Sequence, residues 1–78
     1  YVKIFLNDRK IVTLQTMKKM ESKLPSDMFS RVHRSFIVNR KAVQSFSTTI
    51  CEVNGTKIPV GKNYKNDFVK LMKSNPIL

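Results

Sequence analysis

The segment "ICEVNGTKIPV", residues 50–60, restricts the fold of this chain more than any other stretch. Asn54 and Gly55 lie between two runs rich in β-forming residues, and the Asn-Gly pair favours the positive φ angles of a type I′ turn. The two runs are therefore predicted to pair as an antiparallel hairpin. Pro59 has no backbone N–H to donate, so its strand is expected at the edge of a sheet.

The rest of the chain also reads mainly as β structure. "YVKIFL" alternates between two faces, and "IVTL" resumes the strand after the turn residues "NDRK", which predicts a hairpin of residues 1–6 with residues 10–14. "MFSRV" and "SFIVN" predict strands on either side of His33 and Arg34, with Val32, Phe36, Ile37 and Val38 as apolar anchors facing both sides of the sheet. "AVQSFSTT" predicts a weaker strand.

Two segments change to helical spacing. Apolar residues recur at intervals of three and four in "TMKKMESKL", where Thr16 is a candidate N-cap and Pro25 ends the helix. The same spacing returns in "NYKNDFVKLMKSN", residues 63–75, with Asn63 as a candidate N-cap. A chain of 78 residues is one small domain. The prediction is about six strands and two helices.

The charge balance indicates a polyanionic partner. Lys and Arg number 15 against 5 Asp and Glu, which gives a formal net charge of +10. So large an excess on a small domain favours nucleic acid first and an anionic membrane second. No acidic residue occurs between Asp27 and Glu52, yet this span holds one cationic cluster, and a second cluster follows the Asn-Gly hairpin. Their members are Arg31, Arg34, Arg40 and Lys41, and then Lys57, Lys62 and Lys65.

Catalysis and metal binding have little support in the sequence. One His and one Cys are too few for the usual zinc ligand set, and two Gly residues make no phosphate-binding loop. Cys51 has no partner for an internal disulfide, which fits a reducing compartment. No apolar run reaches the roughly 20 residues of a membrane span. We therefore expect no enzyme, no cofactor, no metal and no membrane partner.

Three segments together resemble a known family. They are "MKKMESKLP", "FSRVHRSFIVNRKAV" and "GTKIPVGKNYKNDF". The chain has an F-x-R-V-H-R-S-[FY]-[IL]-V-N core, followed by a hairpin that ends in I-P-V and by a basic residue before a tyrosine. This pattern resembles the LytTR DNA-binding domain of bacterial response regulators (the LytR/AgrA family). The resemblance covers nearly the whole chain. It implies an elongated, mainly β fold of small antiparallel sheets with one short packed helix and a C-terminal helix.

The resemblance also implies how such a domain meets DNA, because the family inserts loops into successive major grooves. Arg34 and Lys62 match positions in the base-reading loops. His33 and Asn39 belong to the motif and are expected to brace a loop or to contact DNA. The expected phosphate contacts combine family positions with the first cationic cluster: Arg31, Ser35, Arg40, Lys41, Asn63 and Lys65.

The implied setting is the output domain of a two-component transcription regulator in the cytoplasm. Its partners would be double-stranded DNA, a receiver domain N-terminal to it, and a second copy on repeated DNA half-sites. Family members often carry a further DNA-contacting loop and strands before the one that begins here at Tyr1, so residues 1–78 are expected to be a single domain that lacks its N-terminal strands. The alternatives are an RNA- or single-strand-binding basic module, and a basic domain that binds proteins or membrane surfaces.

Overall fold

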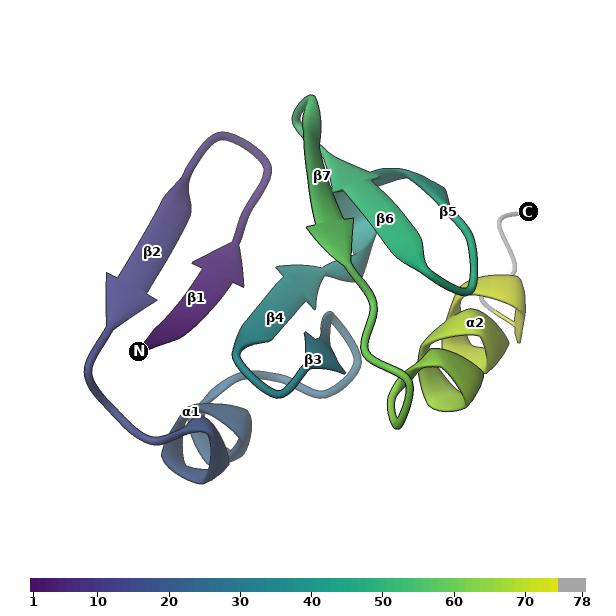
Figure 1. Ribbon diagram of the computed structural model, residues 1–78. Helices are drawn as coiled ribbons and strands as arrows, with labels where there is room; N and C mark the ends of the chain where they lie inside the picture. The colour runs from purple at the N-terminus through teal and green to yellow at the C-terminus, as the bar shows by residue number, and fades with distance from the viewer. Residues whose placement is uncertain (75–78) are drawn as a thin grey trace.

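The computed structural model describes residues 1–74. In these residues seven strands and two helices follow one another with short connections, and Figure 1 shows β3 and β4 in the middle of the molecule. The elements are β1 (Val2–Phe5), β2 (Lys10–Thr13), α1 (Met17–Lys23), β3 (Phe29–His33), β4 (Phe36–Asn39), a 3₁₀ turn (Arg40–Ala42), β5 (Val43–Phe46), β6 (Ile50–Val53), β7 (Thr56–Pro59) and α2 (Lys65–Ser74).

The strands form two small sheets, which confirms the mainly β fold class. One sheet has the order β2-β1-β4-β3 and the other the order β5-β6-β7. The hairpins are antiparallel, but β1 runs parallel to β4, with Ile4 opposite Ile37. A parallel pair needs a long crossover connection, and β2, α1 and β3 supply it. The first sheet is therefore mixed, a detail that the antiparallel expectation did not include.

Two hydrophobic cores lie on opposite faces of the four-stranded sheet. Under α1, Val2, Ile4 and Ile37 pack with Met17, and the side chains of Met20 and Leu24 join them. On the other face the sheet packs against the three-stranded sheet and α2. The buried residues of this larger core are Phe5, Val32, Val38, Cys51, Val53, Ile58, Val60 and Phe68.

Alternation along β1 and β4 explains why these short strands serve both cores. Successive side chains of a strand point to opposite faces. Ile37 is 2% exposed in the α1 core, and Val38 is fully buried in the other core. Val32 is also fully buried and Phe36 is half-buried, so the predicted anchors do face both sides of the sheet. β2 forms one edge of this sheet and leaves Ile11 and Val12 exposed.

The local signals in the sequence are mostly confirmed. Asn54 has φ 50° and Gly55 has φ 78°, as a type I′ turn requires, and the strand that contains Pro59 is at a sheet edge. The Thr16 side chain accepts a hydrogen bond from the backbone N–H of Lys19, with N and Oγ1 3.2 Å apart, and so caps α1.

The predicted start of the second helix needs a correction. α2 begins at Lys65, so Asn63 lies in the preceding turn and not at the N-cap. The carbonyl of Gly61 accepts hydrogen bonds from the backbone N–H groups of Tyr64 and Lys65, at 2.9 and 3.1 Å, and this turn delays the helix. The predicted last residue of the helix, Asn75, lies outside the described residues.

Candidate nucleic-acid interface

Two connections that are distant in sequence lie side by side. We call residues 33–35, from the last residue of β3 to the start of β4, the first loop, and residues 60–64, between β7 and α2, the second loop. Figure 1 shows β7 leading into this second connection and on to α2. The backbone N–H of Gly61 donates to the carbonyl of Val32 at 2.6 Å. A Cβ atom on Gly61 would lie 3.0 Å from the Tyr64 ring and 3.5 Å from the Cα of His33, so this close approach favours a glycine.

The first loop is held by its own residues. His33 Nδ1 accepts a hydrogen bond from the backbone N–H of Ser35 at 3.1 Å, and its ring stacks on Phe36 with centroids 4.6 Å apart. The Ser35 carbonyl accepts from the N–H of Lys3 at 2.9 Å, which ties the loop to β1. Arg34 is exposed, and its side chain makes no hydrogen bond or ion pair within residues 1–74. His33 therefore braces a loop whose cation is available to a ligand.

The second loop also presents polar side chains to solvent. Lys62 and Asn63 are exposed, and Lys65 is half-buried where α2 begins. The residue before Lys62, Gly61, lies against the main chain of Val32 and His33, so the structure brings the second loop beside the first loop, which carries Arg34. Neighbouring loops held by β structure are well placed to present side chains to a partner.

Arg31 was predicted as a phosphate contact, but its guanidinium hydrogen-bonds main-chain carbonyls of the first loop. Nε donates to the carbonyl of His33 at 3.2 Å, and Nη2 donates to the carbonyl of Arg34 at 3.0 Å. The remaining contacts of this guanidinium are with Glu21 of α1 and with the ring of Tyr64. Sequence reasoning missed both partners. The only signal for Tyr64 was its place after Lys62 in the family motif, and Glu21 gave none.

The predicted residues at positions 39–41 lie elsewhere. They follow β4, whereas the first loop precedes it, and four residues of strand span roughly 13 Å. Asn39 Oδ1 accepts from the N–H of Lys41 at 2.9 Å, so this residue braces the 3₁₀ turn. The Arg40 guanidinium donates to the carbonyls of Phe29 and Ser26, both at 3.0 Å, and to the hydroxyl of buried Ser30 at 2.7 Å.

These contacts distinguish the roles of Arg40 and Lys41, the two cations of the 3₁₀ turn. The three hydrogen bonds of Arg40 attach the first two residues of β3, and Ser26 before them, to the turn after β4, which favours a structural role for this side chain. Lys41 is exposed. The structure therefore brings together the first-loop and second-loop residues of the predicted set, and it leaves Asn39, Arg40 and Lys41 at the other end of β4.

Three further features of residues 1–74 concern metal binding, the thiol and membrane insertion. Among residues 1–74, no three His, Cys, Asp or Glu side chains gather where they would hold a metal ion. The Cys51 side chain has no exposed surface, and this burial raises the pKa of its thiol to about 11. Neither described helix has the length and apolar character needed to cross a membrane.

A family model described as the LytTR DNA-binding domain matches residues 1–73. The chain belongs to the LytTR DNA-binding domain family. This LytTR domain is 35% identical to the sensory transduction protein LytT of Enterococcus faecalis, in an alignment covering 83% of this chain and 29% of that protein. It is 33% identical to the LytT protein of Bacillus subtilis, over 92% of this chain and 32% of that protein.

The transcriptional regulatory protein LytR of Staphylococcus aureus is 28% identical, over 83% of this chain and 29% of that protein. The LytTR domain described here therefore spans about a third of the length of the curated relatives that it matches. No solved structure matches this chain.

Proposed function

We propose that this LytTR domain binds double-stranded DNA in a sequence-specific manner. The observation that supports the proposal is the hydrogen bond from Gly61 to Val32, which holds the second loop beside the end of β3 from which the first loop leaves. These two loops carry Arg34 and Lys62 in a chain that belongs to a DNA-binding family. The net charge of +10 supplies the long-range attraction to the phosphate backbone.

Arg34 and Lys62 are the proposed base-reading residues, with their loops inserted in the major groove. Both side chains are exposed, and Arg and Lys are the side chains that donate hydrogen bonds to O6 and N7 of guanine. Phosphate contacts would position the domain without reading sequence. The residues proposed for them are Ser35, Asn63 and Lys65 around the two loops and Lys41 beyond β4.

The wider setting follows from the relatives. Their names describe sensory transduction and transcriptional regulation, so we propose that this domain is the cytoplasmic output domain of a response regulator. A receiver domain would precede it in the full-length protein. A second copy would bind a repeated half-site on the same duplex, because symmetric or repeated sites match paired domains.

Selection from random duplexes, followed by footprinting, tests this proposal and supplies the preferred sequence. Affinity is then measured on that duplex and on a scrambled one for the wild type, Arg34→Ala and Lys62→Ala. Loss of a base contact costs about 1–3 kcal/mol on the preferred site and much less on scrambled DNA. Lys65→Ala, as a phosphate contact, should weaken both duplexes by a similar factor.

Lys10→Ala is the control for loss of one positive charge. Lys10 is exposed and pairs with Phe5 at one end of β1, whereas the first loop contacts β1 at Lys3. Lys10 is therefore remote from the first loop. If Arg34→Ala and Lys62→Ala reduce specific and scrambled binding equally, the base-reading assignment is wrong. Equal affinity for any single strand would instead favour an RNA- or single-strand-binding module.

A further inference from the structure

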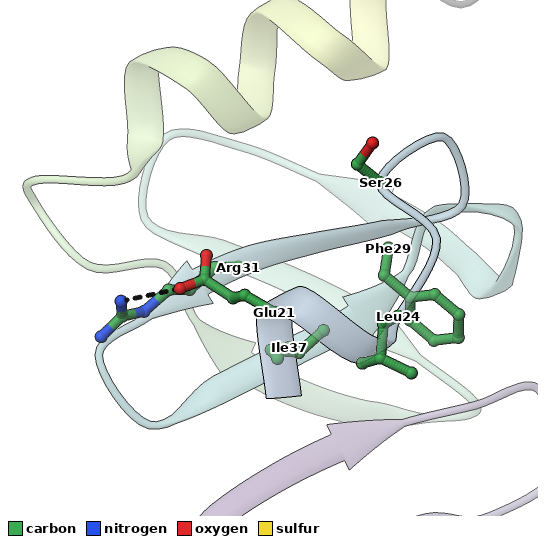
Figure 2. Close-up of a pocket in the computed structure, with 6 residues that line it drawn as sticks. All are labelled: Glu21, Leu24, Ser26, Phe29, Arg31 and Ile37. Carbon is green, nitrogen blue, oxygen red and sulfur yellow. Dashed lines mark hydrogen bonds and ion pairs between the residues drawn. The ribbon is translucent and has the colours of Figure 1, made fainter. Parts of the chain in front are cut away.

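The guanidinium of Arg31 joins three segments of the chain. It hydrogen-bonds the carbonyls of the first loop, as described above, and Nη1 also lies 3.3 Å from Glu21 Oε1 of α1. Figure 2 shows the Glu21 side chain reaching from α1 to Arg31 on β3. The centre of the guanidinium stands 4.8 Å from the centroid of the Tyr64 ring, which belongs to the second loop.

These contacts leave Arg31 poorly suited to hold a phosphate. Three of the five N–H donors of a guanidinium are used by the three hydrogen bonds, and the Tyr64 ring is a cation–π partner. Only 25% of the side chain is exposed. An approaching phosphate would also meet the carboxylate of Glu21, which repels it.

The cleft beside Arg31 adds a second argument. It has a volume of about 310 Å³ and lies between α1, β3 and α2. Glu21 and Asp67, which are both acidic, line it together with Arg31 and Tyr64. Glu21 at the guanidinium and Asp67 in the same cleft make the local potential less positive than at Arg34, on the exposed tip of the first loop.

We propose that Arg31 is a positioning residue that fastens the first loop to the second, with Glu21 supporting it from α1. The inference rests on the proposed DNA-binding function, since it assigns Arg31 an indirect role in that function. The hydrogen bond to the Arg34 carbonyl holds the main chain from which the reading side chain of Arg34 projects. The contact with Tyr64 ties the first loop to the turn that carries Lys62. The relative placement of Arg34 and Lys62 therefore depends on Arg31, although Arg31 itself does not touch DNA.

Glu21→Gln tests the proposal, because the two roles of Arg31 predict opposite signs. If Arg31 bound a phosphate, removing the competing carboxylate would strengthen DNA binding. If Arg31 is a positioning residue, Glu21→Gln removes the ion pair that supports it, and affinity for the selected duplex should fall. The expected loss is about two- to fivefold, which corresponds to the energy of a partly exposed ion pair. Asp8→Asn is the matched control. It removes the same charge, and exposed Asp8 is paired only with its neighbour Arg9 within residues 1–74.

Arg31→Lys is the second test, since it keeps the charge and loses the planar arrangement of donors. We expect Arg31→Lys to lose about tenfold in its preference for the selected over the scrambled duplex, as Arg31→Gln does. Thermal melting of each variant by circular dichroism shows whether it is folded. If a variant at position 31 fails to fold, the comparison of Glu21→Gln with Asp8→Asn still decides.

Two results would overturn the positioning role. One is a Glu21→Gln variant that binds the selected duplex as tightly as Asp8→Asn or more tightly. The other is a folded Arg31→Lys variant with wild-type affinity and preference beside an Arg31→Gln variant that loses affinity for both duplexes by a similar factor, which is the behaviour of a phosphate contact. Failure of the proposed function is a separate result, because a wild-type domain that prefers no duplex shows it before any variant is compared.

Discussion

Among single residues, Cys51 illustrates how burial sets chemical behaviour. Its side chain lies in the larger core with Val53 and Ile58, and the absence of water around the thiol penalises the thiolate. The pKa is raised from 9.0 to about 11 for this reason. Because the thiolate is the reactive form, a buried thiol of raised pKa is inert.

We therefore expect iodoacetamide at pH 8 to modify Cys51 slowly in the native domain and rapidly in denaturant. The protonated thiol favours folding at full strength below about pH 9, and this contribution declines as the pH rises through the folded pKa of about 11. Between pH 7 and pH 10.5, urea unfolding should show the stability of the wild type falling relative to Cys51→Ala by on the order of 1–2 kcal/mol. Rapid alkylation of the native domain would contradict the buried position.

Arg31 and Arg34 show a second effect at this scale. The two side chains are of the same type and three positions apart, yet one is largely enclosed and the other is exposed. The pairing of β3 with β4 shifts register between Arg31 and His33, and the loop turns back so that two of its carbonyls meet the first guanidinium. The surroundings of the two arginines, and not their residue type, therefore determine which side chain is open to solvent.

Among elements, the β6–β7 hairpin depends on the backbone of its turn. Asn54 and Gly55 both have positive φ, and β7 leads directly into the second loop. A Cβ atom at Gly55 would meet nothing within 4 Å. The demand for glycine at this position is therefore one of backbone conformation alone, since no neighbouring atom excludes a side chain.

Gly55→Val should lower the stability of the domain by about 1–2 kcal/mol, because a β-branched residue is strained at positive φ. Gly55→Asn is the matched control, and it should cost less because Asn tolerates the left-handed region. Thermal melting of the three proteins measures the effect. DNA affinity of Gly55→Val should also fall if the hairpin positions Lys62. Equal melting temperatures for the Val and Asn variants would contradict the type I′ turn.

At the scale of the whole molecule, shape and charge act together. The domain measures 34 × 24 × 23 Å and carries a formal net charge of +10. Two of the exposed cations, Arg34 and Lys41, precede and follow β4. A surface of this kind attracts a duplex before any base is read, because the phosphates carry most of the charge of DNA.

The affinity for DNA should therefore fall linearly with salt on logarithmic axes. Each phosphate neutralised contributes a slope of about −0.9, so two to four contacts give a slope of about −2 to −4. Titrations between about 50 and 200 mM salt measure the slope, and Lys65→Ala should make it shallower by about one. An affinity that stays unchanged over this range would rule out phosphate-dominated binding.

Several features of this domain could be predicted from the sequence alone, because they depend on local interactions. The Asn54-Gly55 turn, the Thr16 cap and the alternation of the strands each depend on a few neighbouring residues, and all three are confirmed. The family resemblance depended on three motifs of this chain, and it is confirmed by the match over residues 1–73. The prediction of the start of α2 was less accurate, because the turn at Gly61 depends on contact with a strand that is distant in sequence.

Tertiary structure alone decided which of the cations face solvent. The parallel pairing of β1 with β4, the Gly61–Val32 hydrogen bond and the contacts of Arg31 with Glu21 and Tyr64 all join segments far apart in the chain. No periodicity or turn motif encodes such contacts, because they arise only when the two cores bring the segments together. Sequence therefore identified a cationic DNA-binding fold, while packing determined which arginine is free to reach a ligand.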